Sequence, residues 1–256
     1  MDVSSLFSLD GRTALITGGS RGVGRMIAEG FVRSGVRVYI SARKAEVCDK
    51  TAAELSAHGH CVSLPGDVST VEGIDQLVRI YRDHESSLNI LVNNAGAAWA
   101  APFDDFPEDG WDKVMDLNLK TPFFLTKALK QELVAASTEH LAKVINIASI
   151  DGISLNPLET YSYHASKSGV IQLTRRMAVR LIEDRIAVSA IAPGAFASNM
   201  NKKARDYADE IKGAIPSGRI GEPEDMAAAA IYLASRAGDY VIGSTLTVDG
   251  GVTHAR

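Results

Sequence analysis

This chain of 256 residues has few cysteines, little net charge and no long apolar runs. Its two cysteines, Cys48 and Cys61, are too few for a disulfide framework, and no CxxC motif or Cys/His cluster suggests a metal site. The six histidines form no HExxH motif or other ligand spacing, which disfavours metal-dependent chemistry. We therefore expect two buried structural thiols and no bound metal.

The charge balance and the N-terminus exclude further classes of protein. Twenty-seven Lys and Arg residues against 31 Asp and Glu residues give a net charge of -4, so the chain has no overall attraction to nucleic acid or to an anionic membrane. Residues 1–10 contain no Lys or Arg and no sustained apolar stretch, so neither a signal peptide nor a membrane span is indicated. We expect a cytoplasmic protein without a nucleic-acid or membrane partner.

The residues that are present predict an α/β fold. Hydrophobic residues make up 46% of the chain and charged residues 23%, which is typical of a globular protein. Seven short apolar segments read as strands, at residues 13–17, 36–41, 61–64, 88–93, 144–148, 186–192 and 244–248. Helical periods lie between them, near residues 22–34, 44–57, 71–85, 108–136, 160–184 and 223–236. This alternation predicts a doubly wound Rossmann fold: a seven-stranded parallel sheet with helices on both faces.

The chain shows no sign of a domain boundary. Its length allows one large domain or two small ones, but no Pro/Gly/Ser-rich linker divides it. We expect a single dinucleotide-binding domain over residues 1–256. One segment, Ala195 to Gly221, breaks the rhythm of strands and helices directly after a strand. It is a candidate substrate lid, and the alternative is a surface excursion with a short helix.

A glycine-rich turn, TGGSRGVG at residues 17–24, follows the first strand and precedes the first long helix. Gly18 permits the tight turn, Gly22 lets the backbone approach a pyrophosphate, and Gly24 allows the helix to pack closely on the strand. A merely structural turn is the alternative. We expect this loop to bind a dinucleotide through Gly18, Ser20, Arg21, Gly22, Val23 and Gly24.

The end of the second strand indicates which dinucleotide is bound. A carboxylate there accepts hydrogen bonds from a free 2′-hydroxyl and would repel a 2′-phosphate. Residues 40–44 contain no carboxylate, and Arg43 stands 19 residues after Gly24, near the position of that carboxylate. Arg21 can reach the same phosphate. We therefore predict NADP(H), with two solvated arginines that bind no ligand as the alternative.

A tyrosine and a lysine four residues apart indicate the chemistry. Tyr163 and Lys167 share one face of a predicted helix. We expect the ammonium group to lower the pKa of Tyr163 toward neutrality, from its ordinary value of about 10. Tyr163 would then donate a proton to a carbonyl oxygen as hydride arrives. A packed tyrosine beside a solvated lysine is the alternative, because the YxxxK spacing often occurs by chance.

Other polar residues and turns follow further strands. Ser149 closes the fifth strand, the NNAG motif at residues 93–96 ends the fourth, and Pro193-Gly194 ends the sixth. The carboxyl ends of parallel strands meet at one edge, where doubly wound folds bind ligands. We expect these loops to converge on one crevice in which the Ser149 hydroxyl orients a substrate carbonyl.

Taken together, these motifs resemble the short-chain dehydrogenase/reductase family, and the resemblance covers essentially the whole chain. The matching positions are TGGSRGVG at 17–24, Asp67-Val68, NNAG at 93–96, Asn118, Ser149, Tyr163 with Lys167, Pro193-Gly194 and Asp249-Gly250-Gly251. Their order and spacing are specific to that family. The resemblance implies an oxidoreductase of the Rossmann fold that transfers hydride.

The resemblance also implies residue roles. Asp67 and Val68 would hold the adenine end, and Asn94, followed by Ala95 and Gly96, would support the adenosine ribose side. Lys167 would also hydrogen-bond the nicotinamide ribose, and Asn118 would hold a water that relays protons to Lys167. The family resemblance therefore implies four catalytic residues: Asn118, Ser149, Tyr163 and Lys167.

Two sequence features qualify this assignment. Tyr161 lies two residues before Tyr163, but the residue four positions beyond it is Ala165, so we assign Tyr161 to the substrate wall or to packing. Asn118 and Pro122 interrupt a long helical pattern, which from the pattern alone would be a plain kink.

The turn at Pro193-Gly194 departs from the family pattern. It continues with Phe196 and Ser198, where the family more often has an aliphatic residue and a threonine. The family resemblance assigns the Phe196 backbone NH to the nicotinamide carboxamide and leaves Ser198 a hydroxyl to offer.

Within the family, the chain looks most like 3-oxoacyl (β-ketoacyl) thioester reductases, in the branch of the rhamnolipid-pathway ketoacyl reductases. The similarity is spread over residues 17–30, the neighbourhoods of Trp99 and Trp111, and residues 218–223. It implies NADPH-dependent reduction of a 3-oxoacyl thioester to the secondary alcohol. We expect Trp99, Phe103 and the lid to supply an apolar wall for this substrate.

The thioester carrier stays open. His140 and Asp184 stand where fatty-acid-synthesis members carry basic residues that meet the acidic acyl carrier protein. An aspartate there would repel an acidic partner. A CoA thioester or a free small ketone is therefore as plausible a substrate as a carrier-bound chain.

Two other functions compete with this interpretation. One is a reductase or dehydrogenase of the same fold acting on a polyol, steroid or other small carbonyl. The other is a non-catalytic dinucleotide-sensing protein, which need not keep all four catalytic residues together. The resemblance further implies a homotetramer, with a dimer open, because family members commonly pair the helices expected at 108–136 and 160–184.

Overall fold

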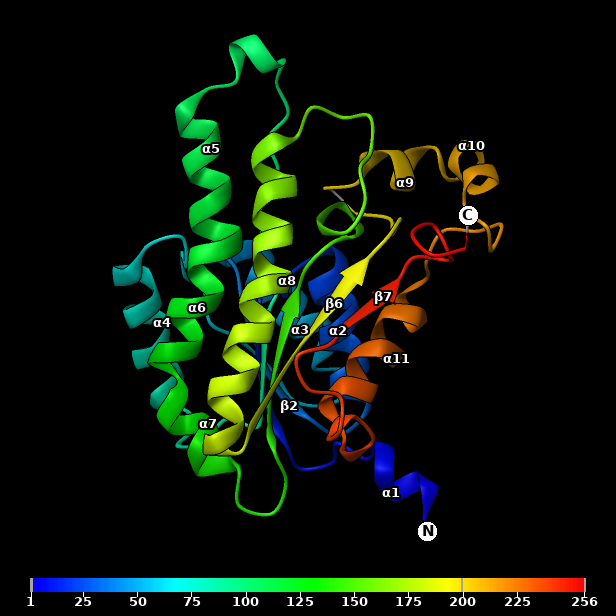
Figure 1. Cartoon of the computed structure of the whole chain (residues 1–256). Helices are drawn as coiled ribbons and strands as arrows, with labels where there is room; N and C mark the ends of the chain where they lie inside the picture. Colours follow the sequence, from blue (N-terminus) through cyan, green and yellow to red (C-terminus); the bar gives the residue numbers. More distant parts are fainter. Residues whose placement is uncertain (1, 199, 256) are drawn as a thin grey trace.

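A seven-stranded, wholly parallel sheet forms the centre of the molecule in the computed structural model (Figure 1). The structure describes residues 2–198 and 200–255, without the side chains of residues 202 and 203. The strands are β1 (Thr13–Thr17), β2 (Arg37–Ser41), β3 (Cys61–Ser63), β4 (Ile90–Asn93), β5 (Ala142–Ile147), β6 (Ile186–Pro193) and β7 (Thr245–Val248). Their spatial order is β3-β2-β1-β4-β5-β6-β7, which confirms the predicted fold class.

Helices cover both faces of the sheet (Figure 1). One face packs against α2 (Gly22–Arg33), α3 (Ala45–Leu55) and α11 (Pro223–Ala234), and the other against α4 (Val71–Arg82), α6 (Thr121–Ala128), α7 (Lys130–Ala136) and α8 (Tyr161–Leu181). The short helices are α1 (Val3–Phe7), α9 (Lys202–Asp206) and α10 (Ala208–Ile211). Among the described residues, no helix has both the length and the apolar character that a membrane crossing requires.

The double covering explains why the strands read as continuous apolar runs. Every residue of β1 is buried. Ala14 and Ile16 belong to the hydrophobic cluster under α2 and α11, while Leu15 between them belongs to the cluster under α4 and α6. Successive side chains of a strand point to opposite faces, so burial on both faces removes the polar half of the alternation.

The region expected as one helix over residues 108–136 is divided, and this corrects the prediction of a single helix. Helix α5 (Glu108–Met115) is followed by a π-helical turn, η2 (Asp116–Lys120), before α6 begins. The backbone NH of Thr121 bonds to the carbonyl of Asp116, five residues back. Such turns are rare and occur mostly at functional sites, and this one contains Asn118. The other predicted strands and helices lie within three residues of their expected ends.

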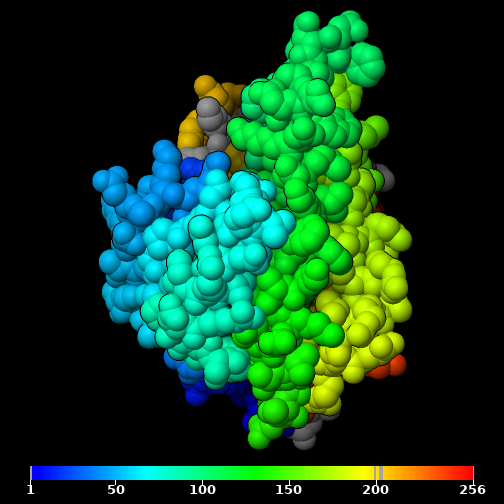
Figure 2. Space-filling view, turned by 90° about the vertical axis from the view of Figure 1, so that its left-hand side faces the viewer, coloured from blue at the N-terminus to red at the C-terminus, as the bar shows by residue number. Residues whose placement is uncertain are grey.

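The strand order positions a binding crevice. The order in which the chain adds strands changes side at β1. Strands β2 and β3 lie on one side of β1, and β4 and the later strands lie on the other. In doubly wound sheets, ligands bind outside the carboxyl ends of the strands at this switch point. The loops after β1, β4, β5 and β6 all lie at that edge, which is uppermost in Figure 1. Figure 2 shows the segment around residues 100–110 projecting beyond the body at the same end.

The segment expected as a lid leaves and re-enters the body at one point. Its two ends are tied by a parallel bridge between Phe196 and Gly221 and by a 2.8 Å hydrogen bond from the Gly221 NH to the Ala195 carbonyl. Between these ends lie α9, α10 and η5 (Lys212–Ala214). The excursion therefore contains short helices and has a narrow base, and its role as a lid stays a prediction.

Candidate active site

The glycine loop presents uncapped backbone NH groups to the crevice. Gly18 and Gly22 adopt φ angles of +66° and +54°, the left-handed region that favours glycine. The Gly18 NH donates to the Ser41 carbonyl at 2.7 Å, which anchors the loop to the end of β2. Arg21, the N-cap of α2, makes no side-chain capping bond. The first NH groups of this helix thus suit the phosphate oxygens of a dinucleotide.

Hydrogen bonds of Asn94 and Thr17 join this loop to the loop after β4. The Asn94 Nδ2 donates to the carbonyls of Thr17 at 2.8 Å and Gly18 at 3.1 Å. The Thr17 hydroxyl accepts from the backbone NH groups of Asn94 at 3.1 Å and Ala95 at 3.0 Å. Sequence reasoning placed Asn94 beside a ribose and gave Thr17 no role. The available signal was the position of Thr17 directly before the first glycine.

The residues assigned to the adenine end, Asp67 and Val68, lie in the loop after β3. Val68 is buried, and its carbonyl accepts from the Thr121 hydroxyl at 2.6 Å. Asp67 is exposed, and its Oδ1 accepts from the Ser69 NH at 3.0 Å. Arg21 and Arg43 are also exposed, and neither forms an ion pair among residues 2–198 and 200–255. Two unpaired guanidinium groups therefore remain available near the expected 2′-phosphate position.

Three of the four predicted catalytic side chains meet where β5 ends and α8 begins. Ser149 lies two residues beyond the end of β5, and Tyr163 and Lys167 lie on the first turns of α8. Lys167 is only 5% exposed, and its Nζ donates to the Ile147 carbonyl at 2.7 Å. The same Nζ lies 5.6 Å from the centre of the Tyr163 ring. The arrangement places a hydroxyl, a phenol and an amine at one end of the crevice.

The expected lowering of the Tyr163 pKa is wrong for the protein environment alone. Burial raises the pKa of Tyr163 to about 12, with the Asp151 carboxylate adding to the rise and hydrogen bonding to Ser149 opposing it. Burial also lowers the pKa of Lys167 to about 8, against the attraction of Asp151. Desolvation disfavours both charged forms, the phenolate of Tyr163 and the ammonium of Lys167. Tyr163 is thus a protonated acid at neutral pH.

Asn118 connects the π-helical turn to the catalytic helix. Its side chain is 1% exposed; the Oδ1 accepts from the Ala97 NH at 2.8 Å, and the Nδ2 donates to the Ala97 carbonyl at 2.9 Å. The same Nδ2 donates to the Ser166 hydroxyl at 3.0 Å, and this hydroxyl donates to the Tyr163 carbonyl at 2.8 Å. Ser166 was missed by sequence reasoning, because nothing in the local pattern marks its partner 48 residues away.

Gly96 of the NNAG motif packs against the Asn118 side chain. A Cβ atom on Gly96 would lie 3.2 Å from the Asn118 Oδ1, so a larger residue would press on the amide. Thr17 thus holds Asn94 and Ala95 of the NNAG motif, and Asn118 holds Ala97, the residue that follows the motif.

The turn after β6 accommodates its unusual residues. A Cβ atom on Gly194 would lie 2.7 Å from the Cα of Asp249, so this turn packs directly on the closing Asp-Gly-Gly motif. Phe196 is buried, and its ring occupies the space that a side chain at Gly221 would need. Ser198 faces the glycine loop, since a Cβ atom on Gly22 would lie 3.2 Å from its Cβ. The bulky side chain of Phe196 is therefore matched by a glycine 25 positions later, Gly221.

The aromatic residues near the mouth divide into two groups. Trp99 lies flat on α5, where a Cβ atom on Gly110 would come within 2.8 Å of its ring and Lys113 Nζ stands 5.1 Å from the ring centre. Phe103 is 73% exposed and lies 5.6 Å, between ring centres, from Tyr161. Partial burial against α5 thus accounts for Trp99, and Phe103 with Tyr161 forms the outer rim.

The described residues contain no group of three or more His, Cys, Asp or Glu side chains able to hold a metal ion. Cys48 and Cys61 are buried free thiols.

Comparisons with known proteins agree with this geometry. A family model described as enoyl-(acyl carrier protein) reductase matches residues 18–253. The chain is 45% identical to the rhamnolipids biosynthesis 3-oxoacyl-[acyl-carrier-protein] reductase of Pseudomonas aeruginosa, over 96% of this chain and 97% of the relative. It is 34% identical to the gluconate 5-dehydrogenase of Gluconobacter oxydans over 99% of each chain.

A solved structure points the same way. The fold matches the Pseudomonas aeruginosa RhlG/NADP active-site complex with a TM-score of 0.94 at 44% identity, covering 97% of this chain and 99% of that one. The names of these proteins differ in substrate and agree in family. The chain therefore belongs to the short-chain dehydrogenase/reductase family and is an oxidoreductase of the ketone and CH–OH pair.

Proposed function

We propose that this protein uses NADPH to reduce the ketone of a 3-oxoacyl thioester to the secondary alcohol. The observation that carries the proposal is the meeting of Ser149, Tyr163 and Lys167 in a chain 45% identical to a 3-oxoacyl reductase over nearly its whole length. Asn118 joins them through Ser166. A sensor without chemistry would have no use for this arrangement.

Each catalytic residue has a role that follows from its surroundings. Bound NADPH supplies hydride to the carbonyl carbon. Tyr163, protonated at neutral pH because its pKa is about 12, donates its proton to the carbonyl oxygen that Ser149 orients. Lys167, with a pKa of about 8, is largely protonated at pH 7 and returns a proton toward Tyr163. We assign to Asn118 the water through which Lys167 recovers its proton.

The cofactor is assigned to the crevice formed by the loops after β1, β2, β3, β4 and β6. The glycine loop offers its NH groups to the pyrophosphate, and Arg21 and Arg43 offer charge-assisted bonds to a 2′-phosphate. The Pseudomonas relative is known as an NADP complex, which supports this choice. Arg43→Ala should reduce the preference for NADPH over NADH by about tenfold or more. An unchanged preference in initial-rate assays would refute this assignment.

The repulsion that Asp184 would exert on an acidic carrier protein is weaker than the sequence suggests. Asp184 forms ion pairs with Lys130 and Arg180, both at 2.8 Å, and these partners hold its pKa below the ordinary value. Its carboxylate therefore does not confront an acidic carrier protein unscreened. CoA and carrier-protein thioesters both stay within the proposal.

Reduction of a sugar-acid ketone is the second candidate, because the chain is 34% identical to a gluconate 5-dehydrogenase over 99% of its length. The deciding experiment measures NADPH and NADH oxidation with acetoacetyl-CoA and with 5-keto-D-gluconate. We expect turnover with acetoacetyl-CoA and NADPH. Turnover confined to the sugar acid would transfer the assignment to the second candidate.

Tyr163→Phe is the control for chemistry itself. It should reduce turnover by a factor of about 10²–10⁴ and leave NADPH binding intact, because only the proton donor is removed. Unchanged turnover in this variant would contradict the assigned role of Tyr163.

We further propose one domain over residues 1–256 with a lid at 195–221, a cytoplasmic location, and assembly into a homotetramer. Exposed apolar side chains on the outer helices support assembly: Trp111 on α5, Phe123 on α6 and Val179 on α8. A single sheet with one crevice supports the one-domain assignment.

A further inference from the structure

One charged side chain beside the catalytic residues has no role in the proposed reaction. Asp151 belongs to η3 (Ile150–Gly152), the 3-10 turn that comes after β5. Its backbone NH donates to the Ser149 hydroxyl at 3.1 Å. A Cβ atom on Gly152 would lie 2.7 Å from the backbone carbonyl of Lys167, so η3 packs directly on the catalytic helix. Asp151 therefore lies between the residue that orients the substrate carbonyl and the helix that carries the proton donor.

The Asp151 carboxylate is partly buried and is not neutralised by a neighbour. Within residues 2–198 and 200–255, no ion pair or side-chain hydrogen bond engages it. The Lys167 Nζ donates instead to the Ile147 carbonyl at 2.7 Å. The carboxylate nevertheless adds to the rise in the pKa of Tyr163 and opposes the lowering of the pKa of Lys167. Coulombic effects fall with distance, so this charge lies close to both groups.

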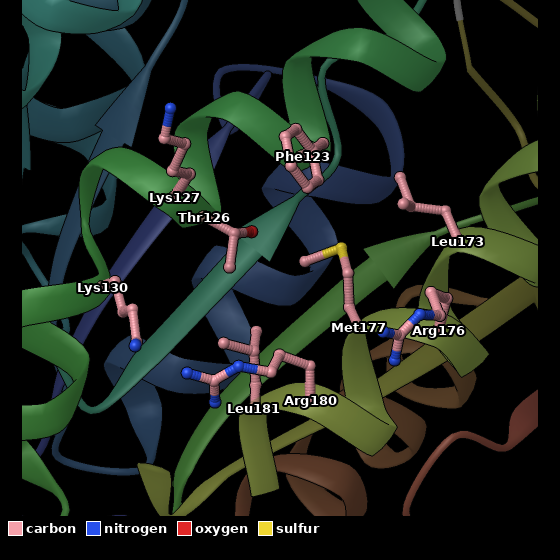
Figure 3. Close-up of a pocket in the computed structure, with 9 residues that line it drawn as sticks. All are labelled: Phe123, Thr126, Lys127, Lys130, Leu173, Arg176, Met177, Arg180 and Leu181. Carbon is pink, nitrogen blue, oxygen red and sulfur yellow. The ribbon is translucent and has the colours of Figure 1, made fainter. Parts of the chain in front are cut away.

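The arginines on the later turns of α8 lie away from the crevice. Tyr163 and Lys167 are on the first turns, whereas Arg176 and Arg180 border a groove between α6 and α8. Figure 3 shows both arginines beside this groove, together with Met177 of the same helix. Arg176 follows Tyr163 by 13 residues (176 − 163), which at 1.5 Å per residue is about 20 Å along the helix axis. The groove belongs to the face proposed for assembly, and its cations do not reach a substrate at Tyr163.

The charge of Asp151 affects what can stand beside the reacting ketone. Ser149 and Tyr163 hold the ketone oxygen in the proposed reaction, so the neighbouring carbons of the substrate lie close to η3. A free 3-oxo acid carries a carboxylate β to its ketone, and Asp151 repels this charge. A 3-oxoacyl thioester has a neutral carbonyl at the same position, and the charges of a CoA carrier lie at the far end of a long chain.

We propose that Asp151 is a specificity-determining residue, which rejects substrates with a carboxylate close to the ketone and favours neutral 3-oxoacyl esters and thioesters. The proposal rests on the thioester reduction proposed above. The buried ammonium of Lys167 attracts carboxylates, and Asp151 offsets this attraction. Rejection of the wrong substrate by a like charge thus separates a thioester from a sugar acid, whose carboxylate is on the same short chain as its ketone.

Initial rates with methyl acetoacetate and with acetoacetate, at saturating NADPH, test this role. Both compounds would use the same proton donor, so a change in proton transfer cancels in the ratio of their kcat/KM values. Wild type should prefer the neutral ester. Asp151→Asn should raise kcat/KM for acetoacetate relative to the ester by about tenfold, the effect of one unit charge in a partly buried site. The backbone bond to Ser149 remains possible in this variant.

Two further variants are controls. Asp151→Glu keeps the charge and should keep the preference of wild type. Asp105→Asn removes the same charge from η1 (Phe103–Asp105) on the exposed rim, where water and salt screen it, and should leave the ratio unchanged. Circular dichroism spectra should show that all three variants are folded.

An unchanged ratio in Asp151→Asn would overturn the proposal. An equal change in Asp105→Asn would also overturn it, since the effect would then come from the overall charge of the protein. If neither small compound is reduced, inhibition constants against acetoacetyl-CoA replace the rates, and a lack of inhibition by the ester contradicts the proposal. Assays with acetoacetyl-CoA keep the proposed function separate: turnover of this thioester with an unchanged ratio removes only the role of Asp151, whereas no turnover removes the proposed function itself.

Discussion

At the scale of single residues, buried polar groups with assigned partners hold the site in shape. Ser166 is fully buried and bridges the Asn118 amide to the Tyr163 carbonyl. It touches no reacting atom in the proposed reaction, so its role is to position the proton donor. The geometry of the catalytic phenol therefore depends on a hydroxyl one turn away on the same helix.

Ser166→Ala should lower kcat by about tenfold with little change in KM, because an unsatisfied Asn118 amide shifts the first turn of α8. Steady-state kinetics with saturating NADPH check this outcome. Ser34→Ala is a matched control, since the Ser34 hydroxyl donates to the Gly30 carbonyl at 2.8 Å on a helix end away from the catalytic residues. An equal fall of kcat in Ser166→Ala and Ser34→Ala would mean that loss of stability alone explains the effect.

Lys167 should make stability depend on pH. Burial lowers its pKa from 10.5 to about 8, so between these values the unfolded chain binds more protons than the folded chain. The free energy of unfolding should therefore rise with pH in this window, by up to about 1.4 kcal/mol per pH unit. The raised pKa of Tyr163 affects the free energy of unfolding only above about pH 10, the ordinary pKa of a tyrosine.

Urea unfolding of wild type and Lys167→Met without added nucleotide, at pH 7.5, 8.5 and 9.5, isolates this contribution. The difference between the two proteins should change with pH. Parallel curves would show that the lysine titrates normally.

At the scale of elements, the turn after β6 and the end of the lid segment fit one another. The Phe196 ring lies where a side chain on Gly221 would project, and their backbones form an isolated bridge. A large residue in this turn thus requires the smallest residue at the segment's other end. Both sides of the pair lie beside the predicted nicotinamide position.

Gly221→Ala should lower the free energy of unfolding by about 1–3 kcal/mol, the usual cost of overpacking. Phe196→Leu in the same chain should recover most of this loss, because the shorter side chain vacates the contested space. Thermal or urea unfolding of the two single variants and the double variant measures the coupling. Additive effects would show that the two residues do not compete for space.

At the scale of the whole molecule, one face carries exposed apolar side chains on the outer helices. Val179 on α8 is 66% exposed, and Trp111 and Phe123 on α5 and α6 are 40% and 42% exposed. Isolated exposed apolar residues are ordinary on monomers. Their placement along adjacent helices is what favours association through this face.

Analytical ultracentrifugation at micromolar concentration should show a tetramer. Val179→Glu should shift the population toward smaller species, because a buried charge without a partner opposes association. A monomeric wild type would contradict the assembly, whatever the variant does.

The fold and most of the site follow from local patterns. Glycines with positive φ, apolar strand segments and the spacing of Tyr163 and Lys167 are properties of neighbouring residues, so sequence reasoning reached them. The π-helical turn around Asn118 was not predictable as such, because the Asn118 side chain bonds to Ala97 and Ser166, which lie 21 and 48 residues away. The same limit explains why Ser166 was missed.

Local patterns along the chain specify which strands form, where the glycine loop stands and which side chains carry the proposed chemistry, since periodicity and turn chemistry act within a few residues. Packing between distant segments sets the direction in which the pKa values of Tyr163 and Lys167 move, because desolvation depends on what is packed around a group. It also brings the Phe196 ring against Gly221. Each of these features arises from residues that are distant in the chain and close in space.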